Sequence, residues 1–382
     1  MFDPSPHVDW LLSHGRMLDL QGLVDGLGAR LRADGTAMMR VRISFRTTHP
    51  LTAALSVIWE ANTAPIKPIT TAHGLEARSD YAGSPLAEIA RTGHPYRRRL
   101  TGVLGADDHV SLHEIQQRGG TDYYGLPLHF AGGSLGMIVF VCNSTGGFSD
   151  DQISGLDHLA AVLTPVVEAH ANHQLAAAIA KSYLGARTGQ RVLDGQITRG
   201  DIETIEAAIL FSDIRGWTAL NAARPPAETL DIANRYFEVI SDAVDNNEGE
   251  ILKFMGDGVL ALFPGDGTDE GRQRACRQAM AAAHAAHGIA ALAALPVSFG
   301  IGIHYGEVLY GNVGARARID FTVLGKSVNI AARVEACCDR LDQSVLISQT
   351  VADMAGTPTR HIATERLKGM DTPMALFTPA TS

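Results

Sequence analysis

Basic and apolar residues alternate along residues 40–46, which read Arg-Val-Arg-Ile-Ser-Phe-Arg. A period of two is typical of a strand with one buried face, so this segment is predicted to be a half-buried strand. Residues 53–59 predict another strand, and two more flank Gly132 and Gly133, whose turn indicates a hairpin. We therefore expect the first 150 residues to mix short helices and strands.

Helical spacing marks the segments on either side of these strands. Apolar residues recur every three or four positions between residues 8 and 31, and again from Ile153 to Val166. Leu175 and Ile179 continue the second pattern after a polar interval. Ser149 is placed to cap the second helix, which has acidic residues in its first turn. The apolar stripe of this helix has two interpretations. It is either a seam between two copies of the chain or a face that packs on the sheet of its own domain.

A polar, glycine-containing segment at residues 182–201 is incompatible with one continuous helix. We therefore expect three parts: a first domain over residues 1–150, a helix and linker over residues 151–202, and a second domain over residues 203–382. A chain of 382 residues is long enough for two or three hydrophobic cores. The linker is either inert or a coupling element, and the sequence leaves both interpretations open.

Composition excludes some classes of protein. Hydrophobic residues make up 46% of the chain and charged residues 19%, an ordinary balance for a folded protein. A net charge of −9 argues against broad nucleic-acid binding, which needs a basic face. The four cysteines show neither metal-ligand spacing nor a disulfide framework, so we expect reduced thiols at Cys142, Cys276, Cys337 and Cys338.

One long stretch without charged residues, residues 278–306, needs a separate interpretation. It contains Pro296 and four glycines, which do not suit a membrane-spanning helix. We predict a buried helix followed by a core strand over residues 297–303. The first residues lack the basic and apolar parts of a secretory signal, so the expected location is the cytoplasm, without a membrane span.

Two aspartates in the second half of the chain each follow a strand-like apolar run. Asp213 lies in Phe-Ser-Asp-Ile-Arg-Gly-Trp-Thr, and Asp257 lies in Lys-Phe-Met-Gly-Asp-Gly. Aspartate supplies hard oxygen ligands, and glycine lets backbone N–H groups approach phosphate closely. The two turns therefore predict a site for divalent cations and a nucleoside triphosphate.

These motifs resemble the catalytic domain of the class III adenylate and guanylate cyclases. The resemblance implies an α+β, ferredoxin-like fold, and the order of elements in residues 203–377 suits a sheet covered by helices on one face. It also implies two Mg2+ or Mn2+ ions per site, held by Asp213, Asp257 and the backbone carbonyl of Ile214. The family's triphosphate-binding N–H groups correspond to three consecutive residues, Gly216, Trp217 and Thr218.

A second motif, Gly325-Lys-Ser-Val-Asn-Ile-Ala-Ala-Arg333, resembles the helix that carries the family's catalytic side chains. Asn329 and Arg333 are four residues apart and point the same way on a helix. The resemblance implies that they hold the ribose and stabilise the transition state, where a planar cationic donor suits the developing charge. Without the resemblance, this spacing is an ordinary solvated face. Three softer candidates for phosphate binding are Lys368, Arg316 and Arg318.

The resemblance assigns base recognition to Lys253 and Thr322. A lysine can only donate, so it can serve N1 of adenine but cannot accept a hydrogen bond from guanine N1–H or N2. The threonine hydroxyl can accept from N6 of adenine. The pair is similar to class IIIb adenylate cyclases and implies ATP as substrate, with cyclic AMP and pyrophosphate as products. A guanylate cyclase and a nucleotide-binding scaffold without turnover are the alternatives. Lys326, often aspartate in relatives, departs from the family pattern.

All these positions occur once in the chain, and in the family they act from opposite sides of a domain interface. The resemblance therefore implies a homodimer with two shared active sites. The first domain resembles a GAF-type sensory domain in the order of its elements and in the motif Leu126-Pro-Leu-His-Phe. Such domains bind a small ligand on one face of the sheet, and the ligand here is unknown. Four aromatic residues either line that pocket or fill a core: Trp59, Tyr123, Tyr124 and His129.

Overall fold

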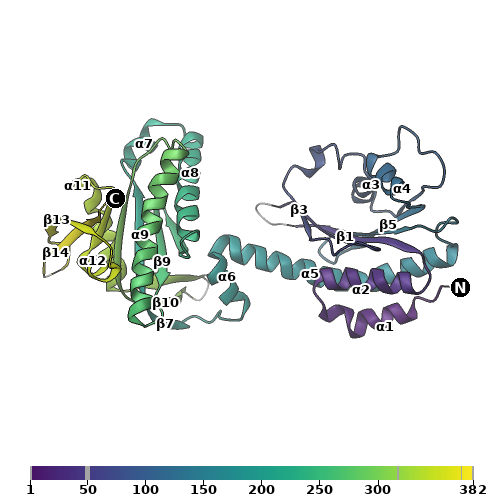
Figure 1. Cartoon of the computed structure of the whole chain (residues 1–382), viewed down its shortest axis with the longest axis horizontal. Coiled ribbons are helices and arrows are strands. Elements are labelled where there is room, and N and C mark those ends of the chain that lie inside the picture. The colour runs from purple at the N-terminus through teal and green to yellow at the C-terminus, as the bar shows by residue number, and fades with distance from the viewer. Residues whose placement is uncertain (1, 48–51, 316–317, 371, 381–382) are drawn as a thin grey trace. The chain divides into compact units, whose positions relative to one another are not determined.

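The computed structural model describes residues 2–47, 52–315, 318–370 and 372–380 and divides into two compact units, Met1–Ile179 and Ala180–Ser382 (Figure 1). The division falls inside one long helix, α5 (Asp150–Leu184). The predicted boundaries at residues 150 and 202 stay a prediction. Arg316 lies outside the described residues.

The first unit is built on a six-stranded antiparallel sheet with the order β3-β2-β1-β6-β5-β4. The alternation in residues 40–46 produces β1 as predicted, since Val41, Ile43 and Phe45 are buried on one face of the sheet. The hairpin around Gly133 joins β5 to β6. The strands span Met38–Arg46 (β1), Ala54–Glu60 (β2), Ile69–Thr71 (β3), Tyr96–Arg99 (β4), Asp122–His129 (β5) and Leu135–Cys142 (β6).

Helices cover both faces of this sheet. On one face, α2 and α5 contribute Leu27 and Leu163 to a core that includes Val41 and Phe45 of β1. The other face carries α3 and α4 (Figure 1). The likeness to GAF-type domains stays a prediction. The helices span Ser5–Ser13 (α1), Leu20–Ala33 (α2), Pro85–Thr92 (α3) and Val110–Gln117 (α4), with short 3-10 turns at Gly15–Met17 and Leu75–Ala77.

The start of α5 confirms the predicted cap. The backbone N–H of Gln152 donates to Ser149 Oγ at 3.2 Å, and the N–H of Ser149 donates to Gln152 Oε1 at 2.9 Å, a reciprocal capping box. Leu159 and Leu163 are fully buried in the core of the first unit. This part of the stripe therefore packs on the sheet of its own domain. Leu175 is half-buried and Ile179 is exposed, so a seam between two copies along the later part of the helix stays a prediction.

The second unit is built on an eight-stranded sheet with the order β13-β14-β12-β10-β7-β9-β8, to which β11 is added beside β10. β10 and β12 pair in parallel, whereas the other pairs are antiparallel. The strands span Ile202–Ile214 (β7), Glu250–Met255 (β8), Gly258–Pro264 (β9), Phe299–Ala315 (β10), Arg318–Leu324 (β11), Val345–Ser348 (β12), Thr359–Glu365 (β13) and Met374–Pro379 (β14).

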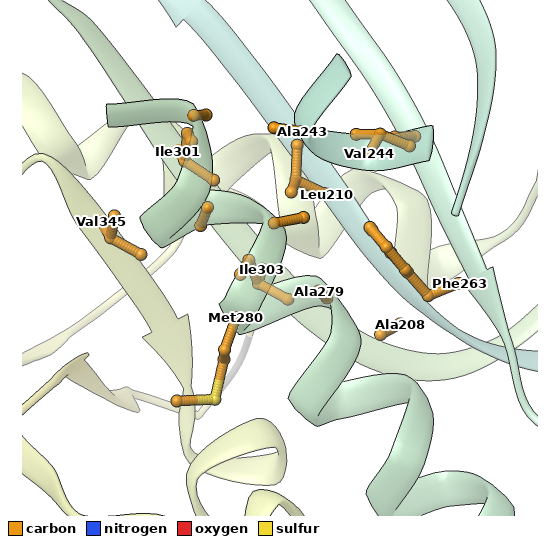
Figure 2. Packing of buried hydrophobic residues seen from close by; sticks show 14 of the residues in the cluster. Ala208, Leu210, Ala243, Val244, Phe263, Ala279, Met280, Ile301, Ile303 and Val345 are labelled. Atoms are coloured by element: carbon orange, nitrogen blue, oxygen red, sulfur yellow. The ribbon is translucent and has the colours of Figure 1, made fainter. Parts of the chain in front are cut away.

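The main core of this unit lies between one face of the sheet and helices α8 and α9. Figure 2 shows Leu210 of β7 and Ile303 of β10 packed with Val244 of α8 and Ala279 of α9. The charge-free stretch forms α9 and then β10, as predicted. The helices span Ala186–Leu193 (α6), Trp217–Ala223 (α7), Pro226–Asp245 (α8), Asp269–Leu292 (α9), Lys326–Glu335 (α10), Cys337–Arg340 (α11) and Gln349–Ala355 (α12).

Helix α10 corrects the expectation that helices cover one face alone. It packs on the face opposite α8 and α9, where Ala331 joins Ile209 and Leu260 in a separate cluster. Glycines in β10 permit this close approach, since a Cβ at Gly302 would lie 2.2 Å from the backbone nitrogen of Glu335. The sheet is therefore covered by helices on both faces.

The cysteines are all free and buried. Over the described residues, we find no helix with the length and apolar character that crossing a membrane requires.

Candidate active site

Asp213 and Asp257 come together at one end of the sheet. Asp213 is the second-last residue of β7, and Asp257 lies in the turn between β8 and β9, next to β7 in the sheet. Burial raises the pKa of Asp213 well above its usual range, and the hydrogen bond and negative charge of Asp257 raise it further. The backbone N–H of Ile214 donates to Asp213 Oδ1 at 3.1 Å. This hydrogen bond lowers the pKa of Asp213 and so partly opposes the other effects.

This pair fits a divalent cation. The two carboxylates are hard oxygen ligands held close together by the strand end and the neighbouring turn. Ile214, the predicted carbonyl ligand, follows Asp213 directly. In the part of the chain that the structure describes, no three His, Cys, Asp or Glu side chains form a metal-binding group. An ion here would need further ligands from phosphates and water, the usual arrangement for Mg2+.

Glu335, at the end of α10, is a third carboxylate close to this pair, and the sequence reasoning missed it. Burial raises its pKa to about 7, and the charges of Asp213 and Asp257 add to the effect of burial, whereas Arg215 opposes it. Gly300 pairs with Asp213 across the sheet, and a Cβ at Gly300 would lie 2.7 Å from Glu335 Oε1. The signal in the sequence was the run of alternate glycines in β10, which lets α10 lie close to the strand.

Buried hydrogen bonds fix the strand end that carries Asp213. Tyr236 OH donates to Ser212 Oγ at 2.7 Å, and Ser212 Oγ donates to the carbonyl of Gly300 at 2.9 Å. Tyr236 and Ser212 are fully buried. Arg215 Nη2 donates to the carbonyl of Gln343 at 2.6 Å, which anchors the residues after the strand.

The predicted triphosphate-binding residues form the turn from β7 into α7. Gly216 has φ +65° and precedes the first residue of α7, a left-handed conformation that favours glycine. Trp217 packs against the main core, whereas Thr218 is exposed. The first N–H groups of a helix have no partner within the helix, so this turn presents donors close to Asp213 in the chain.

Lys253 and Thr322, the predicted base-reading residues, lie on the contacting strands β8 and β11. Lys253 Nζ forms an ion pair with Asp320, and both side chains are about 40% exposed. Asp320 and Thr322 are two apart on one strand and therefore share a face. The structure thus brings Lys253 to the face of β11 that carries Thr322. Sequence reasoning did not assign a role to Asp320, although it stands two residues before Thr322.

Asn329 and Arg333 lie on α10, as predicted. Asn329 is exposed, and its side chain donates to the carbonyl of Gly325 at 3.4 Å. A Cβ at Gly369 would lie 3.5 Å from Arg333 Nη2, so the guanidinium lies beside the turn that contains the exposed Lys368. The structure therefore brings Arg333 and the Lys368 turn together.

Within one chain, these side chains form separate groups. Glu335 faces Asp213, whereas Arg333 is two residues earlier and about 200° away around the helix. Over the described residues, neither Arg333 nor Lys253 makes a hydrogen bond or ion pair with Asp213 or Asp257. One chain therefore presents an acidic group and, apart from it, two cationic groups.

Comparison with known proteins gives matches to the second half of the chain. Residues 202–372 match the family described as adenylate and guanylate cyclase catalytic domain. An adenylate cyclase of Anabaena cylindrica is 36% identical over 163 residues, which cover 42% of this chain and 32% of that protein. An uncharacterised protein of Mycobacterium tuberculosis is 34% identical over 184 residues, which cover 46% of this chain and 33% of that protein. The match thus spans about a third of the length of these curated relatives.

Two solved structures give weaker likenesses. The adenylyl cyclase CyaB from P. aeruginosa has a TM-score of 0.43 and 25% identity, covering 48% of this chain and 97% of that one. The guanylyl cyclase Cya2 has a TM-score of 0.38 and 29% identity, and the likeness covers 48% of this chain and 94% of that one. Both scores are below 0.5, so we base the family assignment on the sequence match. Residues 202–372 form a class III adenylate and guanylate cyclase catalytic domain.

Proposed function

We propose that the protein is an adenylate cyclase that converts ATP to 3′,5′-cyclic AMP and pyrophosphate. The observation that carries the proposal is Lys253, whose ammonium group is held by Asp320 on the face of β11 that bears Thr322. Lysine donates to N1 of adenine and has nothing to offer the N1–H of guanine, whereas the threonine hydroxyl accepts from N6. The adenylate cyclase of Anabaena cylindrica among the relatives agrees with this choice.

Each group of side chains has a role in the reaction. The ribose 3′-hydroxyl attacks the α-phosphate in line with the departing pyrophosphate. Asp213 and Asp257 would hold the divalent cations, Mg2+ or Mn2+, which would lower the pKa of that hydroxyl and neutralise phosphate charge. Asn329 positions the ribose, and Arg333 donates to the phosphate oxygens as negative charge develops there.

The triphosphate is bound by two other parts of the chain. Backbone N–H groups of residues 216–218 point to its oxygens, and Lys368 adds a positive charge. Gly216, Thr218 and Lys368 are exposed, in keeping with contact to a substrate. The contribution of Lys326, the first residue of α10, is electrostatic only.

The active site is shared in a homodimer with two equivalent sites. In support, the acidic group with Asp213 and the cationic groups with Lys253 and Arg333 are separate within one chain. In a dimer with a two-fold axis, the acidic group of one copy faces the cationic groups of the other copy, and this happens twice. Asp213→Ala and Arg333→Ala variants, each inactive alone, should recover activity when mixed. Mixtures that stay inactive although heterodimers form would contradict a shared site.

The N-terminal domain regulates the cyclase through the segment that precedes β7. In support, α6 of this segment docks on the catalytic domain at the buried Glu250, which begins β8. The N–H and hydroxyl of Thr188 donate to Glu250 Oε1 at 2.9 and 2.6 Å, and Tyr310 OH donates to Oε2 at 2.8 Å. Lys253 lies three residues further along the same strand.

Product formation from ATP tests the proposal. Purified protein with Mn2+ or Mg2+ should form cyclic AMP and pyrophosphate in equal amounts, and Asp257→Ala should form neither. Asp231→Ala is a matched control, because Asp231 is exposed on α8 and outside the site. Absence of product with either metal ion from protein that binds ATP would favour a scaffold without turnover.

A further inference from the structure

The N-terminal unit contains a cavity of about 260 Å³ on the face of its sheet that α3 and α4 cover. Its floor includes Arg40 and Arg42 of β1 and Val139 of β6. Arg42 and Val139 are neighbours in register across the two strands. Of the four aromatic residues predicted as pocket candidates, Tyr123 lines this cavity, whereas Tyr124 and Trp59 pack in the core on the other face.

Arg42 enters this cavity with no carboxylate partner among the described residues. Its Nε donates to Ser44 Oγ at 2.9 Å and its Nη2 to Ser56 Oγ at 2.8 Å, and both serines are buried. Nη1 has no hydrogen bond within the described part of the chain. Burial, with a smaller effect from the charge of Arg40, lowers the pKa of the guanidinium to about 10. Arg42 is partly buried, and a partly buried cation without a counter-charge costs free energy that an anion would recover.

The other arginines of the cavity already have acidic partners. Arg40 pairs with Glu60 at 2.9 Å, and Arg118 approaches the same carboxylate at 3.3 Å. Arg78 forms two hydrogen bonds with Asp80, at 3.0 and 2.7 Å. The open position for a negative charge is therefore at Arg42.

Two acidic side chains line the cavity, and neither cancels the charge of Arg42. Asp80 is bound by Arg78 through both carboxylate oxygens. Glu114 is exposed on α4. Arg118, the residue that follows the last turn of α4, is four residues further on and therefore lies on the same side of the helix as Glu114. Neither acid contributes to the pKa of Arg42, which responds to Arg40 and Tyr123 besides burial.

The rest of the lining is largely apolar. Ile69, Leu75, Ile115 and Val139 contribute aliphatic surface, and Tyr123 contributes an aromatic ring that is 4% exposed. A volume of about 260 Å³ lies just below the range of roughly 300–1,000 Å³ that holds drug-sized ligands. The cavity therefore suits a small molecule with one charged end and an apolar body.

We propose that this cavity binds a small organic anion, whose carboxylate or phosphate group pairs with the Arg42 guanidinium and whose apolar part lies against Val139 and Ile115. A guanidinium is suited to either group because its planar N–H donors match two oxygens at once. Ser44 and Ser56 fix its orientation from below and leave Nη1 for the ligand. This site requires no cyclase activity, so its test is separate from that of the proposed function.

Calorimetric titration and thermal unfolding of the full chain test the site with three probes: benzoate, phenylphosphate and the neutral benzamide. At least one of the two anions should bind and raise the Tm, whereas benzamide should do neither. The anion that binds distinguishes a carboxylate site from a phosphate site. In Arg42→Gln, the Kd for that anion should rise about tenfold or more, since the charged hydrogen bond is lost.

Two controls separate binding from folding. Arg16→Gln removes the same charge from an exposed position in the same unit and should leave the Kd unchanged. Arg42→Gln without ligand should unfold at the same temperature as wild type or higher, because it removes an uncompensated, partly buried charge. Arg42→Lys, which keeps the charge, should bind more tightly than Arg42→Gln. The proposal is overturned if neither anion binds wild type, if benzamide binds equally well, or if folded Arg42→Gln retains the wild-type Kd.

Discussion

Lys253 of β8 and Asp320 of β11 form an ion pair that joins two strands distant in sequence. Both side chains are about 40% exposed, so the pair contributes little to folding stability. Its consequence is positional, because it fixes the ammonium group on the face of β11 that carries Thr322. In the proposed function, base selection therefore depends on two strands rather than on one residue.

Replacement of the lysine should weaken the use of ATP. Lys253→Met is expected to lower kcat/KM for ATP about 10–100-fold, because a charged hydrogen bond to the base is lost. Lys181→Met, an exposed lysine of α5, is the control and should match wild type. Steady-state kinetics with ATP measure both variants. A Lys253→Met enzyme with wild-type kcat/KM would show that this lysine does not contact the base.

The acidic pair should destabilise the metal-free protein. Asp213→Asn is expected to raise Tm by about 2–4 °C without metal, the shift that corresponds to roughly 1 kcal/mol, because it removes repulsion with Asp257 and Glu335. Mn2+ with a nucleotide should raise the Tm of wild type but not of Asp213→Asn.

Asp231→Asn serves as the control for that series and should respond to Mn2+ like wild type, since its side chain is exposed on α8. The interpretation fails if Asp213→Asn gains as much stability from Mn2+ and nucleotide as wild type does.

Gly302 should be intolerant of any side chain. A Cβ there would lie 2.2 Å from the backbone nitrogen of Glu335, so Gly302→Ala must displace α10 and the Arg333 side chain it carries. We expect a loss of about 1–3 kcal/mol of stability and a large loss of activity. Gly288→Ala is the matched control, since no atom lies within 4 Å of its Cβ position in α9, and it should stabilise by about 0.5–1 kcal/mol. Equal activities of the two variants would disprove the close packing.

His304 should make the protein less stable in acid. It is buried, with Nδ1 2.8 Å from Ser348 Oγ, and burial lowers its pKa to about 4. Because the unfolded state has a pKa near 6.5, it binds the proton more readily, so stability falls as pH drops from about 6.5 to 4. The contribution of this histidine is on the order of 3 kcal/mol over that window.

Denaturant unfolding at pH 7 and pH 4.5 measures this effect. The loss of stability between the two should be smaller in His304→Gln than in wild type, whereas His361→Gln, at an exposed position, should resemble wild type. An unchanged pH dependence in His304→Gln would contradict the assignment.

Thr188 should be needed to hold the connecting segment on the catalytic domain. Thr188→Val removes the hydroxyl that donates to the buried Glu250 at 2.6 Å, and the poorly satisfied carboxylate should cost about 1–3 kcal/mol. Thr188→Ser keeps the hydroxyl and should retain most of that stability. Thermal unfolding compares the two, and equal losses would mean that the methyl group rather than the hydrogen bond matters.

Local sequence was sufficient for the parts of the site that a single turn defines. Asp213, Asp257 and Gly216 lie in short segments whose strand ends and glycines are visible in the sequence, and the structure brings the two aspartates together. The i, i+4 spacing placed Asn329 and Arg333 on α10 for the same reason.

Contacts between distant segments could not be predicted in this way. Asp320 reaches Lys253 because β11 meets β8. Glu335 lies close to Asp213 because α10 packs on the glycines of β10. Neither residue has a local motif that reveals its partner. The stripe of α5 left two interpretations open, because helical periodicity identifies a buried face without showing what covers it.

The central claim is most directly tested by a competition between the two nucleotides. Purified protein given equal concentrations of ATP and GTP with Mn2+ should form cyclic AMP in large excess over cyclic GMP. Lys253→Met should reduce that excess, because the donor to adenine N1 is lost. Cyclic GMP as the main product of wild type would contradict the role assigned to Lys253, and with it the proposal that the enzyme is an adenylate cyclase.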